Sequence, residues 1–214
     1  MQSVALIDYG SGNLRSAEKA LQKAAGGLAR PAEIVTTDDP DRIAAADLVV
    51  LPGVGAFAAC MAALQARDGV IEAMTAAVKG RGAPFLGICV GLQLLAQRGL
   101  EFGETAGLGW IEGDVKVIKP ADRHFKVPHM GWNSLDGRLP GAMFHGLGAH
   151  PHMYFTHSFA IFPTHEADVA ASVDHGGRFA AAVLRDNVAG VQFHPEKSQA
   201  AGQRLLTNVL EWRP

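Results

Sequence analysis

The fold of this chain is decided by the stretch Ala83-Pro84-Phe85-Leu86-Gly87-Ile88-Cys89-Val90-Gly91-Leu92-Gln93-Leu94-Leu95. Its first half is a short apolar run typical of a buried strand, and its leucine-rich second half predicts a helix. Gly-x-Cys-x-Gly at the junction is the thiol counterpart of the nucleophile elbow, a sharp strand-to-helix turn that lifts a side chain above a sheet. Glycines on both sides allow the strained backbone and the close chain approach that such a turn requires.

Cys89 has two interpretations at this point. The N–H groups and the dipole at a helix start favour a thiolate, which makes the residue a candidate nucleophile. A buried, inert thiol is the alternative, because cysteine outside disulfides is among the most buried residue types. A base and an orienting group elsewhere in the chain would decide between the two.

The composition indicates a globular protein with one domain, residues 1–214. The length suffices for one well-buried core, and 48% hydrophobic and 19% charged residues are ordinary values. A net charge of −2 provides no basic surface for nucleic acid or an anionic membrane. Two cysteines make no disulfide framework. Because we find neither a signal peptide nor a membrane-spanning run, we expect a cytoplasmic protein.

Strand and helix patterns alternate through the first half of the chain. We expect strands at 4–7, 33–36, 47–51 and 83–88, and helices at 14–25, from 40 onward and at 61–79 with a break near 68–69. Asn13 is the expected cap of the first helix, and Gly26-Gly27 its end. This alternation predicts a parallel sheet covered on both faces.

The second half predicts a more antiparallel layer of the same α/β domain. Strand-like runs occupy 113–118, 132–135, 153–161, 169–173, 178–184 and 188–193, with a hairpin signal at 174–177. A final helix is expected at 199–212.

His194-Pro195-Glu196 follows the last predicted strand and offers the base and orienting group that Cys89 needs. On an extended segment the side chains of His194 and Glu196 point the same way, so Glu196 can hold the imidazole ring. The alternative is an ordinary turn after a strand.

Pro52-Gly53-Val54-Gly55 ends another predicted strand. Ligands of open α/β sheets bind at the carboxyl ends of the strands, where the elbow also points. Backbone N–H groups at Gly53 and Val54, with that of Val90, are candidate oxyanion donors. A plain strand-to-helix turn is the alternative, and no phosphate-binding glycine motif is present.

These motifs resemble class I (triad) glutamine amidotransferases. Further stretches narrow the resemblance to the family of glutaminase subunits of imidazole glycerol phosphate synthases. They are Ile7-Asp8-Tyr9-Gly10-Ser11-Gly12-Asn13-Leu14-Arg15-Ser16, Leu51-Pro52-Gly53-Val54-Gly55-Ala56-Phe57, Pro128-His129-Met130-Gly131-Trp132-Asn133, Tyr154-Phe155-Thr156-His157-Ser158 and Gln192-Phe193-His194-Pro195-Glu196-Lys197-Ser198-Gln199. The resemblance runs from residue 7 to 199, and it implies a three-layer, flavodoxin-like sheet with an antiparallel, hairpin-rich C-terminal part.

The resemblance implies a glutaminase. Cys89 would attack the side-chain amide of glutamine, His194 would shuttle the proton and Glu196 would orient His194, through a glutamyl thioester that water hydrolyses to glutamate. It implies no cofactor or metal, and glutamine contacts at Gly55, Gln93, His157 and Ser158. The family commonly has Tyr where this chain has Phe159. That change is harmless if the contact is through the backbone, and weakens glutamine binding if the hydroxyl is needed.

The resemblance also implies a partner. Ammonia would pass to a TIM-barrel cyclase subunit, which makes imidazole glycerol phosphate and aminoimidazole carboxamide ribotide. A closed route suits ammonia, because in open water it would be protonated and lost. The strand at 52–55 would be able to flip, so the isolated subunit would be nearly silent. Expected interface residues are Asn13, Arg15, Pro128, His129, Met130, Trp132, Tyr154 and Lys197; Trp132 and Tyr154 alone would be ordinary core or surface aromatics.

Three other interpretations are less consistent with these residues. Another thiol hydrolase, such as a peptidase, is disfavoured by Gln93 and the interface motifs, and a non-catalytic regulatory subunit by the intact Cys89, His194 and Glu196. Glutaminase subunits for anthranilate or pyridoxal phosphate synthesis are disfavoured by residues 128–133. A metal site among His145, His150, His152 and His157 is not expected, because no metal-binding spacing accompanies them.

Overall fold

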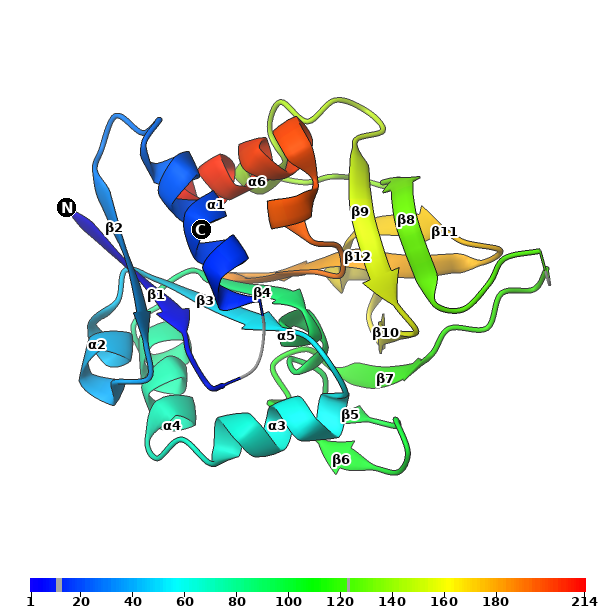
Figure 1. Ribbon diagram of the computed structural model, residues 1–214, viewed down its shortest axis with the longest axis horizontal. Coiled ribbons are helices and arrows are strands. Elements are labelled where there is room, and N and C mark those ends of the chain that lie inside the picture. The colour runs from blue at the N-terminus through cyan, green and yellow to red at the C-terminus, as the bar shows by residue number, and fades with distance from the viewer. Residues whose placement is uncertain (11–12, 123) are drawn as a thin grey trace.

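The computed structural model describes residues 1–10, 13–122 and 124–214. Its centre is a seven-stranded sheet in the order β11-β12-β13-β4-β3-β1-β2 (Figure 1). Five neighbouring strands are parallel, and the hairpin of β11 and β12 adds two antiparallel strands at one edge. The bounds are β1 Gln2–Ile7, β2 Ala32–Thr37, β3 Leu48–Gly53, β4 Phe85–Cys89, β11 Val169–Asp174, β12 Arg178–Arg185 and β13 Val188–Val191.

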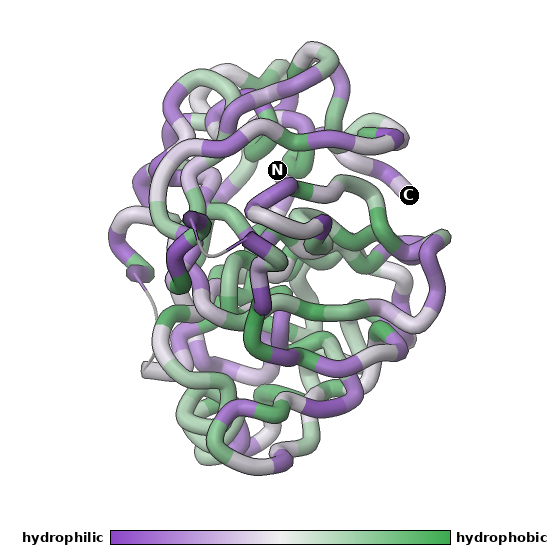
Figure 2. The backbone as a smooth tube through the Cα atoms, turned by 90° about the vertical axis from the view of Figure 1, so that its right-hand side faces the viewer, coloured by the Kyte–Doolittle hydropathy of each residue, from purple (hydrophilic) through white to green (hydrophobic). Residues whose placement is uncertain are grey.

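Helices cover both faces of this sheet, as the alternating sequence pattern predicts. The first and last helices, α1 (Leu14–Ala25) and α6 (Gln199–Glu211), pack together on one face (Figure 1). On the other face lie α2 (Pro40–Ala45), α3 (Phe57–Gln65) and α4 (Val70–Thr75), with α4 continued by a π-helical turn at Ala76–Gly80. Figure 2 shows apolar chain concentrated in the interior strands and polar chain in the outer loops. The result is the expected three-layer α/β architecture.

Two smaller sheets extend the domain beyond the antiparallel edge. One has the order β10-β7-β5-β6, and the other pairs β8 with β9. Their bounds are β5 Arg98–Gly99, β6 Thr105–Ala106, β7 Gly113–Val117, β8 His129–Ser134, β9 His152–His157 and β10 Phe159–Pro163. The short strands β5 and β6 have no counterpart among the predicted strands.

The prediction of a single strand at 153–161 is wrong. The chain forms β9, which pairs with β8, and then turns at Ser158 into β10, which pairs with β7. One continuous apolar run therefore serves two different sheets, and the turn between them is available for a binding site. The hairpin at 174–177 is confirmed, since His175 N donates to the Gly177 carbonyl between β11 and β12.

Local signals otherwise place the helices well. The bounds of α1 match the prediction. Asn13 stands at the N-cap position, but its side chain accepts no backbone N–H of the described residues: Oδ1 accepts from the Ser16 hydroxyl, while the Asn13 carbonyl accepts from Ala17 N. The break near 68–69 is confirmed, with Gly69 at φ 75°. None of the helices in the described ranges is long and apolar enough to cross a bilayer.

Candidate active site

The elbow stands at the carboxyl end of β4. Cys89 has φ 55° and ψ −110°, a strained conformation for a residue that is not glycine. A Cβ on Gly87 would lie 2.6 Å from the Gly91 carbonyl oxygen, and one on Gly91 would collide with the Leu51 carbonyl of β3. The expectation that both flanking glycines serve close backbone approach is confirmed.

The helix after the elbow is shorter than the sequence predicts. α5 spans only Val90–Gln93, because the next carbonyls bond to a later loop instead of continuing the helix. The Leu94 carbonyl accepts from Leu108 N, that of Leu95 from Ile111 N and that of Ala96 from Gly109 N. The helix dipole is consequently a small contribution at Cys89, and the side chains around the sulfur matter more.

His194 follows β13 and forms a buried pair with Glu196. Its Nδ1 lies 2.8 Å from Glu196 Oε1, and the two side chains are 3% and 4% exposed. Pro195–Lys197 forms a 3-10 turn rather than the extended segment expected, yet the turn still brings the two side chains together. The loop is held in place because His194 N donates to the Tyr154 carbonyl and the Ser198 hydroxyl donates to that of His194.

The surroundings of His194 favour its charged form. Burial alone lowers the pKa of the imidazole, but attraction to Cys89 and Glu196 outweighs burial and raises that pKa to about 9. The second ring nitrogen, Nε2, is buried without a hydrogen-bond partner among the described residues, and His194 and Cys89 line the same pocket. Catalytic hydrogen bonds are often long before substrate binds and tighten in the loaded complex.

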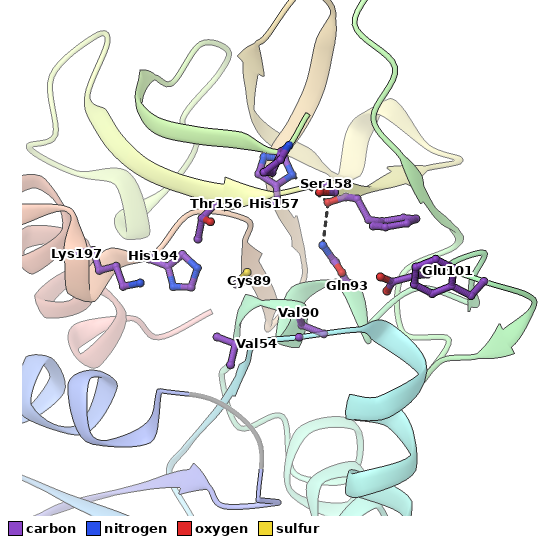
Figure 3. Close-up of a pocket in the computed structure, with 14 residues that line it drawn as sticks. Val54, Cys89, Val90, Gln93, Glu101, Thr156, His157, Ser158, His194 and Lys197 are labelled. Carbon is purple, nitrogen blue, oxygen red and sulfur yellow. Dashed lines mark hydrogen bonds between the residues drawn. The ribbon is translucent and has the colours of Figure 1, made fainter. Parts of the chain in front are cut away.

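A cavity of about 470 Å³ lies over Cys89, at the carboxyl ends of the strands (Figure 3). Ten residues expected in the site or at the partner face line it: Val54, Gly55, Cys89, Val90, Gln93, Pro128, His157, Ser158, His194 and Lys197. Four residues not predicted complete the lining: Glu101, Phe102, Thr156 and Phe159. The structure thus brings the elbow, the His-Pro-Glu segment and the Pro-Gly-Val-Gly segment to one cavity.

The candidate oxyanion donors lie beside the elbow. Gly53, the last residue of β3, is in register with Cys89, although it does not line the cavity. Its α-carbon is enclosed by Gly91, the Tyr9 hydroxyl and Val90. Val90 begins α5, so its N–H is one that a helix leaves without an internal partner. Tyr9 Oη donates to the Pro52 carbonyl at 2.8 Å, which fixes the start of this segment.

Phe159 contributes through its backbone. Its carbonyl accepts hydrogen bonds from Gln93 Nε2 and from His157 Nδ1, each at 2.9 Å. These bonds need no phenolic hydroxyl, so within the free protein phenylalanine serves here as well as tyrosine.

His157 belongs to a chain of neutral histidines. Because a carbonyl can only accept, His157 Nδ1 carries the proton given to Phe159, and its Nε2 then accepts from His129 Nδ1 at 3.0 Å. Asn133 Nδ2 donates to His129 Nε2. Burial is the main reason that the pKa of His157 falls to about 4 and that of His129 to about 3, with the neighbouring histidines lowering both further.

The expected partner face is exposed, except that His129 is buried and Tyr154 is half-buried. Met130 is 64% exposed and Trp132 47%, and the Lys197 ammonium lies 5.8 Å from the centre of the Tyr154 ring. His129, in contrast, is buried between Phe155 and His175, so its side chain is not a surface contact. The remaining expected interface residues, Asn13, Arg15, Pro128 and Lys197, are exposed, whereas Tyr154 is half-buried; Ser11 and Gly12 of the first motif lie outside the described residues.

Of the histidines considered for a metal, only His157 is buried; His145, His150 and His152 are exposed. Within the described part of the chain, no three potential metal ligands gather closely enough to hold an ion.

Besides Thr156, two polar side chains at the site were missed by sequence reasoning. Glu101 lines the cavity, and its Oε2 accepts from Phe57 N at the start of α3. It lies between two strands of two residues each, where no local pattern marks it. Gln192, in the same motif as His194, is fully buried, and its Nε2 donates to Cys89 Sγ at 3.7 Å. The sequence feature that could have identified Gln192 is its position two residues before His194.

Comparison with known proteins identifies the family of this chain. The family model for class I glutamine amidotransferases matches residues 5–211, so the chain belongs to that family. Curated relatives carry the name imidazole glycerol phosphate synthase subunit HisH. The Caulobacter vibrioides protein is 64% identical over 100% of both chains, and the Rhodospirillum rubrum protein is 56% identical over 99% of both.

Solved structures support the fold independently. A crystal structure of a glutamine amidotransferase matches with a TM-score of 0.70 at 20% identity and covers 97% of both chains. A glutamine amidotransferase from Thermotoga maritima matches with a TM-score of 0.62 at 15% identity, over 98% of this chain and 96% of that one. The α/β glutamine amidotransferase fold expected from the sequence is confirmed.

Proposed function

We propose that this chain is the glutaminase subunit of an imidazole glycerol phosphate synthase, working through a triad of Cys89, His194 and Glu196. The observation that carries the proposal is a strained, buried thiol sharing a cavity with an imidazole whose other nitrogen is held by a carboxylate at 2.8 Å. The identity to HisH proteins along the full length supports this substrate class and this assembly. We also propose that residues 1–214 act as one domain.

The proposed reaction has two halves. The Cys89 sulfur gives its proton to His194 and then attacks the side-chain amide carbon of glutamine as a thiolate, and the charged His194 passes that proton to the departing ammonia. A γ-glutamyl thioester remains on Cys89. Water then attacks this thioester, His194 removes the water's proton and returns it to the sulfur, and glutamate is released. Glu196 keeps the ring oriented and stabilises the imidazolium in both halves.

Binding groups for glutamine are proposed around the same cavity. Glu101 carries the negative charge that suits the α-ammonium group, opposite the elbow end of the pocket (Figure 3). Gln93 gives its amide hydrogens to Phe159 and Gln192, so its Oε1 is the atom left to accept from substrate. Gly55, His157 and Ser158 complete the wall. Gly53, Val54 and Val90 are the proposed oxyanion segment, each N–H donor being worth about 2.7–4 kcal/mol.

The ammonia is proposed to go to a TIM-barrel cyclase partner that makes imidazole glycerol phosphate and aminoimidazole carboxamide ribotide. The exposed apolar side chains of Met130 and Trp132, together with Asn13, Arg15, Pro128, Tyr154 and Lys197, are the proposed docking face. Pro128 and Lys197 both line the cavity and belong to this face, so cavity and docking face are continuous.

The test separates the glutaminase half from the synthase half. In the complex with the cyclase subunit, Cys89→Ser should abolish glutamine-dependent synthesis and leave synthesis from added ammonium salts intact. The Cys60→Ser variant is the matched control, because Cys60 is buried in α3, does not line the cavity, and a serine hydroxyl can keep the hydrogen bond that the Cys60 thiol donates to the Val54 carbonyl. Equal loss of both activities in Cys89→Ser would overturn the proposal.

A further inference from the structure

Gln192 is a buried amide that the proposed triad chemistry does not use. It directly follows β13, is 0% exposed, and its backbone N–H donates to the Ala181 carbonyl of β12. Its side chain therefore leaves a fixed backbone and has one direction in which to extend, toward β4 and the elbow. An amide buried this deeply is costly unless all its hydrogen bonds are made.

The orientation of the Gln192 amide follows from its neighbours. The Phe159 carbonyl can only accept, so the Gln93 atom 2.9 Å from it is the amide nitrogen. That same nitrogen lies 3.1 Å from the Gln192 side chain, so the Gln192 atom there is the acceptor Oε1. Gln192 Nε2 must then face the other way, and the atom it meets is Cys89 Sγ at 3.7 Å.

We propose that Gln192 is a further residue of the catalytic site, whose N–H donates to the Cys89 sulfur and holds it in the reactive position. This inference rests on the proposed function for the reaction, but the contact itself involves only the free protein. A sulfur carrying negative charge accepts a stronger hydrogen bond than a neutral one, so this donor favours the thiolate. His194 approaches the sulfur as the proton carrier, whereas Gln192 cannot titrate and stays a donor throughout the cycle.

Gln93 acquires a second role in this arrangement. Its nitrogen locks the Gln192 amide, while its Oε1 remains for substrate. Loss of Gln93 should therefore disturb the sulfur as well as glutamine binding. Loss of Gln192 should disturb the sulfur, while Gln93 keeps its place in the binding wall through the hydrogen bond to the Phe159 carbonyl.

The experiment compares Gln192→Met, which keeps length and apolar bulk but removes the donor, with the wild-type chain. Iodoacetamide alkylation of Cys89 at neutral pH, followed peptide by peptide in a mass spectrometer, reports the thiolate fraction without needing turnover. We expect alkylation about 10-fold slower. In the complex with the cyclase subunit we expect kcat for glutamine to fall about 10- to 100-fold with KM nearly unchanged, the usual range for a hydrogen bond to a charged group.

Gln2→Met is the matched control, since Gln2 is buried on β1, does not line the cavity, and its replacement should change neither measurement. Gln192→Glu is the second variant: it keeps the shape but turns a carboxylate oxygen toward the sulfur, and should slow alkylation further. Unchanged alkylation and kcat in both Gln192 variants, with folding confirmed by circular dichroism, would overturn the inference. A wild-type complex that hydrolyses no glutamine would instead contradict the proposed function, and the alkylation result would still stand on its own.

Discussion

Three buried histidines in this molecule have pKa values shifted in opposite directions. His194, His157 and His129 are 2%, 6% and 3% exposed, so the depth of burial does not separate them. The pKa of His194 is nevertheless raised to about 9, whereas those of His157 and His129 fall to about 4 and about 3. Burial penalises the charged ring in all three, and the neighbours decide the outcome. The neighbours of His194 are Glu196 and Cys89. The hydrogen-bond partners of His157 and His129 are the Phe159 carbonyl, the Asn133 amide and each other's rings.

The comparison shows how one domain keeps a proton carrier and a neutral scaffold within the same cavity wall. A carboxylate beside a histidine stabilises the protonated ring, while a carbonyl fixes the tautomer of a neutral ring without charging it. His157 and His194 both line the cavity, so the distinction is made over a short distance.

The largest effect is expected from replacing the charged histidine, His194, or the carboxylate that holds it. In the complex with the cyclase subunit, His194→Ala should lower kcat for glutamine about 10⁴-fold or more, because the proton carrier is lost. The fall in kcat for Glu196→Gln should be about 10²-fold smaller than the fall for His194→Ala, because an orienting group is less essential than the base it holds. Steady-state kinetics on the two variants checks the order. A larger loss for Glu196→Gln than for His194→Ala would contradict the roles assigned to the pair.

A smaller effect is expected from replacing one of the two neutral histidines. His129→Phe keeps a ring to stack on Phe155 but removes the N–H given to His157 Nε2, leaving a buried acceptor unsatisfied. We expect the free energy of unfolding to fall by about 1–3 kcal/mol, measured by urea denaturation. His129→Asn, whose amide nitrogen can stand near the lost Nδ1, should recover part of the loss. If His129→Phe were as stable as the wild-type chain, the hydrogen-bonded histidine chain would not be structural.

The finest test uses pH, because the two groups contribute to stability on opposite sides of neutrality. His129 and His157 have folded-state pKa values below the unfolded value of 6.5, so their contribution is present above pH 6.5 and is lost as pH falls toward about 4 and about 3. His194 has a raised pKa, so its contribution is present below pH 6.5 and is lost as pH rises toward about 9. Each contributes a slope of at most about 1.4 kcal/mol per pH unit.

Urea denaturation across this pH range should therefore show an acid limb that His129→Phe makes shallower and an alkaline limb that His194→Ala makes shallower. His129→Phe should leave the alkaline limb unchanged. His194→Ala should also make the acid limb slightly shallower, because the charged His194 is one of the groups that lower the pKa of His157. A change of the alkaline limb in His129→Phe would mean that the two groups titrate together and are not separate environments.

Much of this arrangement was predictable because its signals are local. The helix α1 is bounded by Asn13 and Gly26, and the elbow is marked by glycines that the structure shows to be sterically required. The pairing of His194 with Glu196 depends on residues two apart, so even a wrong backbone conformation for Pro195–Lys197 led to the right contact.

The parts that could not be predicted depend on pairing between distant segments. The division of residues 153–161 between β9 and β10 follows from the positions of β8 and β7. The early end of α5 follows from the loop that takes up its carbonyls. Glu101 and Gln192 reach the site from segments whose own patterns are ordinary, and His129 is buried by contacts with His175 and Phe155 that no spacing reveals.

The tight backbone contact between Gly91 and Leu51 has a consequence for anyone who wishes to redesign this pocket for a longer amide. With no side chain between them, the strand that ends at Gly53 and the turn that holds the sulfur form one unit, and neither can be displaced to make room without the other. Space can be gained where Phe102 lines the cavity, because this side chain is 95% exposed and its ring can be trimmed without opening a void. The side of the cavity that holds Cys89 determines the chemistry, and the side formed by the loop between β5 and β6 is where substrate size can be changed.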